Sequence, residues 1–582
     1  MPAPGSRDPN AATVIAEIAL ERGDCRVAAE TYASAAQRGD VAVARRASEV
    51  GLACEHLPAA WESVKRWRAL APNDRDAAAV YATVALKLYR IPEARTAIGT
   101  LLQGEGDAGT ASSEQGPGAN AGRKSAAQAD AKAGVKPPLK TDKSVKPAAA
   151  QSAADASKES DTKLAELAAL LLEQSDAATV LSAMNGAIDT NSASSGALAL
   201  LAELALEGYD VKRAEQLAYL ALKRDPSSYD GKRIIARAYV MRGDAVNAIA
   251  TARDVMKIDP KRGMFELAEV LAALDRLEEA RRELERLQAS DAPAGEVDRR
   301  LALLALQGGD LKEAQRRFTE LAASNEASEA ALLYLSDIAA RQGDPETALA
   351  GYQRLVNSSV AVTARTRAAA LLLDKKERGE ALTLLDDYVS EHPDSGFEMT
   401  ITKAHLLSDH GESDAGLALL ATALDRHPQH PSIQYDRAVL LERAGKVRES
   451  VTALEHLLAE REEDPTLQNA LGYTLADHDL DLTRAESLIR RSLSVMPDNP
   501  AVLDSMGWVR FKRGDSKGAL ESLQRAYMLA HDPEIAAHWG EALWKSGQQQ
   551  EARKVWAGAL ARNPDSDELK ATLARLVKTE KP

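Results

Sequence analysis

The chain has 582 residues, a formal net charge of −14 at pH 7 and a pI near 5.4. This acidic balance provides no electrostatic footprint for nucleic acid or for an anionic membrane surface. Aromatic residues make up only 4% of the chain, and the apolar content depends on alanine and leucine, which favours helix packing over a sheet-rich fold. Because the length exceeds what one hydrophobic core usually organises, we expect several domains or an all-α repeat array.

Targeting and cysteine patterns are sparse. No segment approaches the ~18 consecutive apolar residues of a membrane helix. The opening MPAPGSRDPN has neither the charged region nor the apolar region of an export signal, so we expect no such signal in the sequence as written. The two cysteines, Cys25 and Cys54, are too few for a disulfide framework or a cysteine-based zinc site.

Residues 1–103 contain three helical hairpins. The first, AEIALERGDCRVAAETYASAA, places Gly23 at the turn and Ala28 in the second helix. Ala60 and Ala94 take the position of Ala28 in the next two hairpins, at spacings of 32 and 34 residues. Such regular recurrence of a small residue indicates a repeated helix–turn–helix unit.

Residues 104–160 interrupt this pattern. They contain no aromatic residue and no isoleucine, and their large apolar residues are Val135, Leu139 and Val145. A segment of this kind buries too little apolar surface to offset the entropy of ordering, so we predict a disordered linker. Seven basic residues between Arg123 and Lys146 could contact an acidic partner or a lipid, but a solvated tether is the simpler interpretation.

The repeat resumes at residue 161 and continues to residue 582. One position of the second helix recurs at spacings of 32 to 37 residues: Ala177, Ala214, Ala248, Ala280, Ala314, Ala348, Ala381, Gly416, Ser450, Ala485, Ala519 and Ala552. Turn glycines are predicted in step with it, at Gly243, Gly309, Gly343, Gly411, Gly445, Gly514 and Gly547. After Pro564, the segment DSDELKATLARLVK is predicted to be a capping helix.

Residues 465–564 contain the clearest copies of the unit. Pro465, Pro500 and Pro533 each follow an Asp or Asn, which is typical of a helix that begins behind a capping side chain. Equivalent glycines in the first helices, at Gly472, Gly507 and Gly540, recur every 33 to 35 residues. This unit resembles the tetratricopeptide repeat, in which small residues let two antiparallel helices touch. We therefore predict an all-α superhelical solenoid of such repeats with a disordered linker.

In such arrays the first helix of each pair lines a concave groove, with positions 2, 5, 9 and 12 facing it. Counted from the helix-start prolines, Tyr473, Trp508, Phe511 and Trp544 occupy groove positions. This concentration of aromatic residues favours a protein-binding hot spot. The alternative, in which Trp508 and Trp544 are large core residues of the last repeats, stays open.

Two arginines are a further candidate for the groove. Arg233 and Arg237 occupy positions 5 and 9 of one repeat and so point the same way. They could bind a carboxylate of a partner or form an exposed basic face.

No motif for catalysis is recognisable, because HExxH, P-loop and GxSxG patterns are absent. His427 and His430, in the segment HPQH, have the spacing of a weak metal site, but without an evident third ligand we interpret them as turn residues. We expect a protein that is not an enzyme and that needs no cofactor or metal.

The amino-acid sequences of the last repeats resemble one family more closely than they resemble the general repeat. QNALGYTLADHDLDLTRAESLIRRSL, LDSMGWVRFKRGD and AAHWGEALWKSGQQQEARKVWAGAL, with the opening AEIALERGD, resemble tetratricopeptide-repeat lipoproteins of the proteobacterial envelope, including the adaptor of a carboxyl-terminal processing protease. The resemblance implies a periplasmic, outer-membrane-associated scaffold for that protease and its substrates, often peptidoglycan hydrolases. The lipid-bearing cysteine of such proteins follows an apolar signal, whereas no apolar stretch precedes Cys25.

Two questions stay open at this point. Cys25 and Cys54 lie near the turns of neighbouring hairpins, where they could pair in an oxidising periplasm or remain two buried thiols. The alternatives to a protease adaptor are an assembly scaffold for an exopolysaccharide or secretion complex, and a cytoplasmic interaction scaffold.

Overall fold

A computed structural model describes residues 9–103, 146–289, 294–324, 328–564 and 566–577. Within these ranges the chain forms thirty-one α-helices and no strand, which confirms the predicted all-α solenoid. None of the described helices combines the length and the apolar character needed to cross a membrane.

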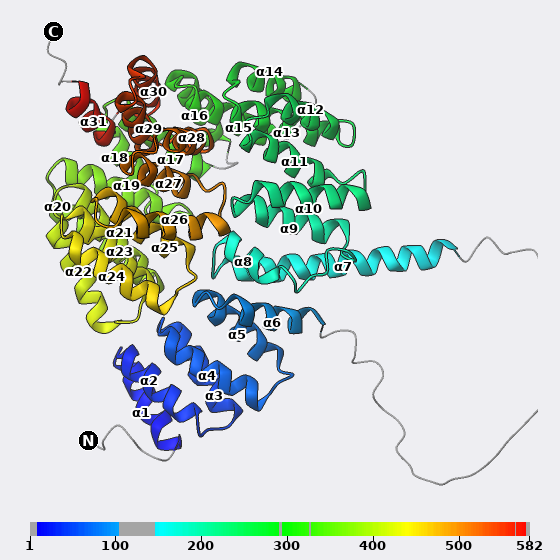
Figure 1. Cartoon of the computed structure of the whole chain (residues 1–582), viewed down its shortest axis with the longest axis vertical. Helices are drawn as coiled ribbons and strands as arrows, with labels where there is room; N and C mark the ends of the chain where they lie inside the picture. Colours follow the sequence, from blue (N-terminus) through cyan, green and yellow to red (C-terminus); the bar gives the residue numbers. More distant parts are fainter. Residues whose placement is uncertain (1–8, 104–145, 290–293, 325–327, 565, 578–582) are drawn as a thin grey trace, which may run out of the picture.

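The helices pair as hairpins along the chain (Figure 1). The N-terminal pairs are α1 (Pro9–Glu21) with α2 (Cys25–Ala36), α3 (Val41–Ala53) with α4 (Leu57–Leu70), and α5 (Arg75–Lys87) with α6 (Ile91–Gln103). The next pairs are α7 (Lys146–Leu172) with α8 (Ala177–Met184), α9 (Ser195–Glu207) with α10 (Val211–Arg224), α11 (Tyr229–Met241) with α12 (Ala245–Val255), α13 (Pro260–Ala273) with α14 (Leu277–Gln288), and α15 (Ala294–Gln307) with α16 (Leu311–Ala323).

The remaining pairs complete the array. They are α17 (Ser328–Arg341) with α18 (Pro345–Gln353), α19 (Ala361–Asp374) with α20 (Arg378–Glu391), α21 (Gly396–Asp409) with α22 (Ser413–Arg426), α23 (Pro431–Arg443) with α24 (Val447–Glu460), α25 (Pro465–Asp477) with α26 (Leu482–Val495), α27 (Pro500–Lys512) with α28 (Ser516–Leu529), and α29 (Pro533–Lys545) with α30 (Gln549–Arg562). A short 3₁₀ turn, Pro393–Ser395, precedes α21, and the predicted capping helix is α31 (Asp567–Val577).

Most second helices begin behind a side-chain cap, and the cap sets the register of the buried small residue. At α10 the Asp210 carboxylate accepts a hydrogen bond from the Arg213 amide at 2.9 Å, and Ala214, four residues after the cap, is fully buried. Eleven of the twelve predicted small positions are buried four residues after the N-cap position, six of them behind a side-chain cap. A cap that fixes the first turn therefore also fixes which residue meets the partner helix.

The exception is Ala177, which is only half-buried. Asp176 caps α8 through the Thr179 amide at 2.9 Å, so the fourth residue after the cap is Val180, which is fully buried. Val180 lies 34 residues before Ala214, in place of the 37 residues that separate Ala177 from Ala214. The predicted register at α8 was wrong by three residues, and the corrected spacing is regular.

The turns within hairpins need a left-handed residue. All seven predicted turn glycines have φ between 74° and 84°, a region that costs glycine nothing. Six other hairpin turns place a side-chain-bearing residue at this position, with φ between 50° and 67°: Glu55, Tyr89, Tyr209, Asp275, Lys376 and Asp479.

The boundary of the predicted linker differs from the structure. Helix α7 begins at Lys146, inside the segment 104–160 that we predicted to be disordered, while 104–145 lies outside the described residues. The segment 146–160 is rich in alanine, which has the highest helix propensity, and our prediction weighed only its lack of large apolar residues.

Cys25, the first residue of α2, and Cys54, the C-cap of α3, form a disulfide with their Cα atoms 5.3 Å apart. Of the two alternatives left open by the sequence, the structure has the bonded pair.

The array curves into a superhelix that returns to itself (Figure 1). The amide of Asp498, before α27, donates to the carbonyl of Tyr209, between α9 and α10, at 2.8 Å. Arg525 of α28 and Arg562 of α30 contact Met241 and Asp275 across sequence separations of 284 and 287 residues. We call this line of contacts the seam.

Candidate functional site

The first helices of the last repeats form one continuous wall. Helix α25 packs against α27, α27 against α29, and α29 against α31. Elements on the inner side of a curved stack lie closer together than those on the outer side, so this wall is the inner face.

Nine side chains, eight of this wall and one of the neighbouring α23, touch or adjoin one another, and we call them the inner strip. They are Glu442, Tyr473, Asp477, His478, Asp504, Trp508, Glu534, His538 and Glu568.

His538 organises one end of the inner strip. Its Nδ1 lies 2.9 Å from Oδ2 of Asp504, and both side chains are buried. The Tyr473 hydroxyl donates to Oε1 of Glu534 at 3.1 Å. Glu568, at the start of α31, adds a third carboxyl group beside His538.

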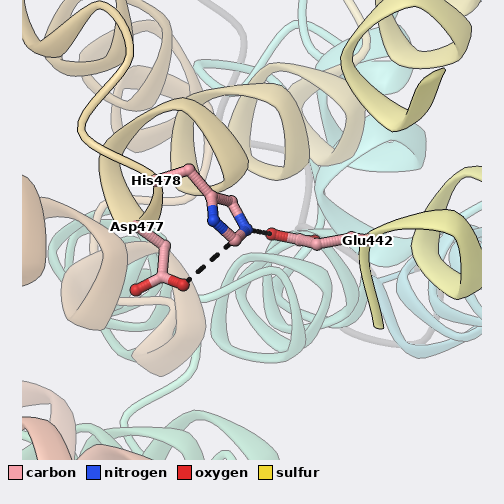
Figure 2. Close-up of side chains that lie close together, drawn as sticks. All are labelled: Glu442, Asp477 and His478. Carbon is pink, nitrogen blue, oxygen red and sulfur yellow. Dashed lines mark hydrogen bonds and ion pairs between the residues drawn. The ribbon is translucent and has the colours of Figure 1, made fainter. Parts of the chain in front are cut away.

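A second group lies at the other end of the strip (Figure 2). Nε2 of His478 lies 3.2 Å from Oε1 of Glu442 and 3.9 Å from Oδ2 of Asp477. The indole N–H of Trp508 donates to Oδ1 of Asp477 at 2.9 Å, and the Trp508 ring stacks on His538. Trp508 therefore joins the two ends.

The inner strip carries more acid than base. Desolvation by neighbouring side chains raises the pKa of Glu568 to about 7 although the residue is exposed, and the neighbouring Glu534 carboxylate adds to the rise. Desolvation also raises the pKa of the exposed Glu534 and of the half-buried Glu442. Burial alone would lower the pKa of His538, but Asp504 outweighs it and raises that pKa to about 9. Five carboxyl groups thus face two imidazoles, and above pH 7 the strip has surplus negative charge.

At each end of the inner strip, three atoms of the types that bind metals lie within 4.8 Å of one another. They belong to Glu534, His538 and Glu568 at one end, and to Glu442, Asp477 and His478 at the other. Imidazole and carboxylate groups suit divalent cations. Because exposed carboxyl groups often cluster without a metal, we assign no ion to them.

The predicted aromatic residues lie in this wall, but they are less accessible than a groove position suggests. Trp508 and Trp544 are 6% and 9% exposed. Phe511 stacks on Trp508 with ring centroids 5.2 Å apart, and Trp544 packs on Trp556 at 5.6 Å. Tyr473 is half-buried. Their contact with a partner stays a prediction.

The two arginines bind a carboxylate of the chain itself. Nη2 of Arg233 lies 2.9 Å from Oε2 of Glu203, and Nη1 of Arg237 lies 2.5 Å from Oε1 of the same residue. This pairing leaves less of their charge for a partner, and their role in binding also stays a prediction.

His427 and His430 pack against the ring of Phe397, with centroids 4.6 and 4.3 Å away. Nδ1 of His430 accepts the Ile433 amide and so caps α23. These contacts fit the interpretation as turn residues.

The sequence prediction missed the charged members of the strip. Counting from Pro431, Pro500 and Pro533 places Glu442, Asp504 and Glu534 at positions 12, 5 and 2, which are groove positions by the rule used for the aromatics. The groove-position rule therefore also identifies these acidic residues, but the sequence prediction considered only aromatic and basic residues.

Comparisons with known proteins agree with the architecture. The tetratricopeptide-repeat family model matches residues 299–359 and 401–465. A TPR repeat-containing protein of Pseudomonas aeruginosa is 28% identical over 254 residues, 44% of this chain and 43% of that protein, so the match spans less than half of the relative.

Two solved structures are also similar. A thermophilic TPR protein of Thermus thermophilus matches over 31% of this chain and 98% of its own, with 25% identity and a TM-score of 0.29. Yeast Tom70 matches over 66% and 98%, with 12% identity and a TM-score of 0.34. The described helices form an α-solenoid of hairpins, and two parts of the chain match the tetratricopeptide-repeat family model.

Proposed function

We propose that the solenoid is an adaptor that holds a carboxyl-terminal processing protease of the cell envelope together with its substrates, peptidoglycan hydrolases. Repeat arrays of this kind serve as protein-interaction scaffolds. The protease is suggested by the resemblance of the last three repeats to envelope adaptors. The observation that carries the binding role is the inner strip, a continuous acidic and aromatic wall across four repeats.

The charge of the strip indicates the chemistry of the partner. A lysine or arginine side chain placed among Glu534, Glu568 and Asp504 would neutralise their surplus negative charge. The bound segment is therefore one that carries basic residues.

The adaptor acts through concentration and performs no chemistry itself. Holding protease and substrate on one scaffold makes their encounter intramolecular, with an effective concentration of about the millimolar range for short flexible tethers. Cleavage then depends on the protease alone, while the adaptor sets which substrates reach it.

An envelope location, with attachment to the outer membrane through a lipid, belongs to the same proposal. The disulfide between Cys25 and Cys54 supports it, because disulfides persist in oxidising compartments such as the periplasm and are rare in the cytosol.

The test is affinity capture of an envelope extract with this chain, alongside a purified, catalytically inactive protease of the carboxyl-terminal processing type. We expect the protease to be retained, and substrate to disappear faster when active protease and adaptor are combined. Retention of a secretion or polysaccharide component without the protease would reject the adaptor role and favour an assembly scaffold.

A further inference from the structure

The seam joins parts of the superhelix that are one turn apart. Each contact is made between a hairpin turn or helix end of the earlier turn and a residue of α28, of α30 or of the loop before α27. The sequence separations of the side-chain contacts, 284 to 287 residues, are nearly constant, so the two turns stack in a regular register.

Asp498 is the centre of the seam. Its Oδ2 accepts a hydrogen bond from the amide of Val211, the first residue of α10, at 3.2 Å. Its Oδ1 lies 2.9 Å from Nη2 of Arg525. A carboxylate at a helix N-terminus satisfies an otherwise unpaired amide and interacts favourably with the helix dipole.

Arg525 makes the complementary contact. Its Nη1 donates to the carbonyl of Met241, the last residue of α11, at 2.6 Å. A cation is favoured at a helix C-terminus for the same reasons. One ion pair therefore bridges the beginning of α10 and the end of α11, both in the earlier turn of the superhelix.

The seam is loosely packed compared with the repeats. A cavity of about 530 Å³ lies in it, lined by Val211, Lys212, Glu215 and Arg242 on one side and by Asp498 and Arg525 on the other. Outside the seam, a second cavity of about 290 Å³ lies between Trp61 and Leu88 of the N-terminal hairpins and Pro431 and Arg461 of the later repeats. Within hairpins, by contrast, alanine-lined helices touch directly.

The seam also depends on groups that water and salt can reach. The side chains of Arg525 and Asp498 are 27% and 20% exposed, and those of Arg562 and Asp275 are 40% and 56% exposed. Polar contacts around cavities resemble a transient interface between domains more than a core. The contacts can therefore separate while each repeat stays folded.

We propose that the seam is a latch, in which Asp498 and Arg525 hold one turn of the superhelix against the other and their release opens the spiral sideways. Opening would expose the inner strip to a folded partner, and this consequence rests on the proposed function. The existence of the latch does not depend on the proposed function.

The test measures the distance across the seam in the full chain. Spin labels are placed at Val246→Cys on α12 and Glu521→Cys on α28, two exposed positions. The native cysteines are bonded to each other, so only the introduced thiols react. Double electron–electron resonance then gives the label-to-label distance distribution.

We expect a longer and broader distribution for the double variant Asp498→Ala with Arg525→Ala. Wild type in 1 M NaCl, where the Debye length is about 3 Å, should change in the same direction without any substitution. The control Arg443→Ala removes a 2.8 Å ion pair with Asp409, between first helices of neighbouring repeats, and should leave the distribution unchanged.

The latch is overturned if neither the double variant nor salt alters the distances, or if the control alters them equally. Association with the inactive protease is measured on the same samples and should be faster for the open variant. If wild type fails to bind the protease, the adaptor proposal fails, whereas the label distances still decide the latch.

Discussion

The imidazole of His538 lies face to face with the indole of Trp508, with 4.2 Å between ring centroids and 19° between ring planes. Asp504, at Nδ1, raises the pKa of this imidazole to about 9, so at neutral pH the contact is a cation–π interaction between neighbouring repeats. Trp508 is consequently part of the wall that carries the strip.

The first prediction concerns Trp508. Replacing it with alanine removes a buried ring and the hydrogen bond to Asp477, and we expect the free energy of unfolding to fall by about 3–5 kcal/mol. Denaturant unfolding measures this loss. Phe511→Ala, at a half-buried neighbour, should cost less, and an unchanged midpoint for Trp508→Ala would place the indole in solvent.

The second prediction is a fall in stability with rising pH. The folded pKa of Glu568, about 7, lies above its ordinary value of 4.5, so its contribution is complete below 4.5 and is lost as pH rises through 7. The folded pKa of His538, about 9, lies above 6.5, and its contribution is lost as pH rises through 9. Both contributions therefore lower the free energy of unfolding as pH rises.

Urea unfolding at a series of pH values checks this slope. Glu568→Gln should remove the lower part of the slope and His538→Gln the upper part. Glu551→Gln, at an exposed residue of α30, is the matched control and should retain the wild-type slope. Stability that rises from about pH 5 to about pH 9 would contradict the assignment.

The sequence determines the repeats largely through local rules. A small residue that recurs every 32 to 35 residues is visible in the chain, which is why eleven of the twelve positions were predicted. At α8, Ala177 and Ala178 are both small residues that fit the pattern. Only the hydrogen bond from the Thr179 amide to Asp176 shows that Val180 takes the buried position of the repeat.

The site and the seam depend on contacts that no local pattern records. Position 9 predicts that Trp508 faces the groove, but not that His538 of the next repeat covers it. The partners of Asp498 lie more than 280 residues away, so no spacing rule predicts them.

The third prediction concerns backbone strain. Lys376 has φ of 67°, a conformation that costs an L-residue about 1–2 kcal/mol. Lys376→Gly should stabilise the chain by about 0.5–1 kcal/mol, after allowing for the greater flexibility of unfolded glycine. Gly343→Ala, at the same turn position with no atom within 4 Å of the new Cβ, should destabilise it. Thermal unfolding measures the change in stability of each variant and so checks both the expected gain and the expected loss.

The fourth prediction concerns the disulfide. Cys25 and Cys54 close a loop with a sequence separation of 29, for which the chain-entropy estimate is about 3.6 kcal/mol. The variant Cys25→Ser with Cys54→Ser should lose stability in the N-terminal hairpins, which is measured as faster hydrogen exchange of their backbone amides. Exchange in α25–α30 should stay as in wild type, and a uniform loss would contradict independent repeats.

The central claim is that the inner strip holds the partner, and its most direct test is the dissociation constant for the inactive protease. Glu534→Gln with Glu568→Gln removes negative charge from the strip, whereas Glu521→Gln with Glu551→Gln removes the same charge from exposed positions of α28 and α30. We predict binding weakened by about tenfold or more for the first pair, equivalent to about 1.4 kcal/mol, and wild-type binding for the second. Equal affinity for both pairs would contradict the account.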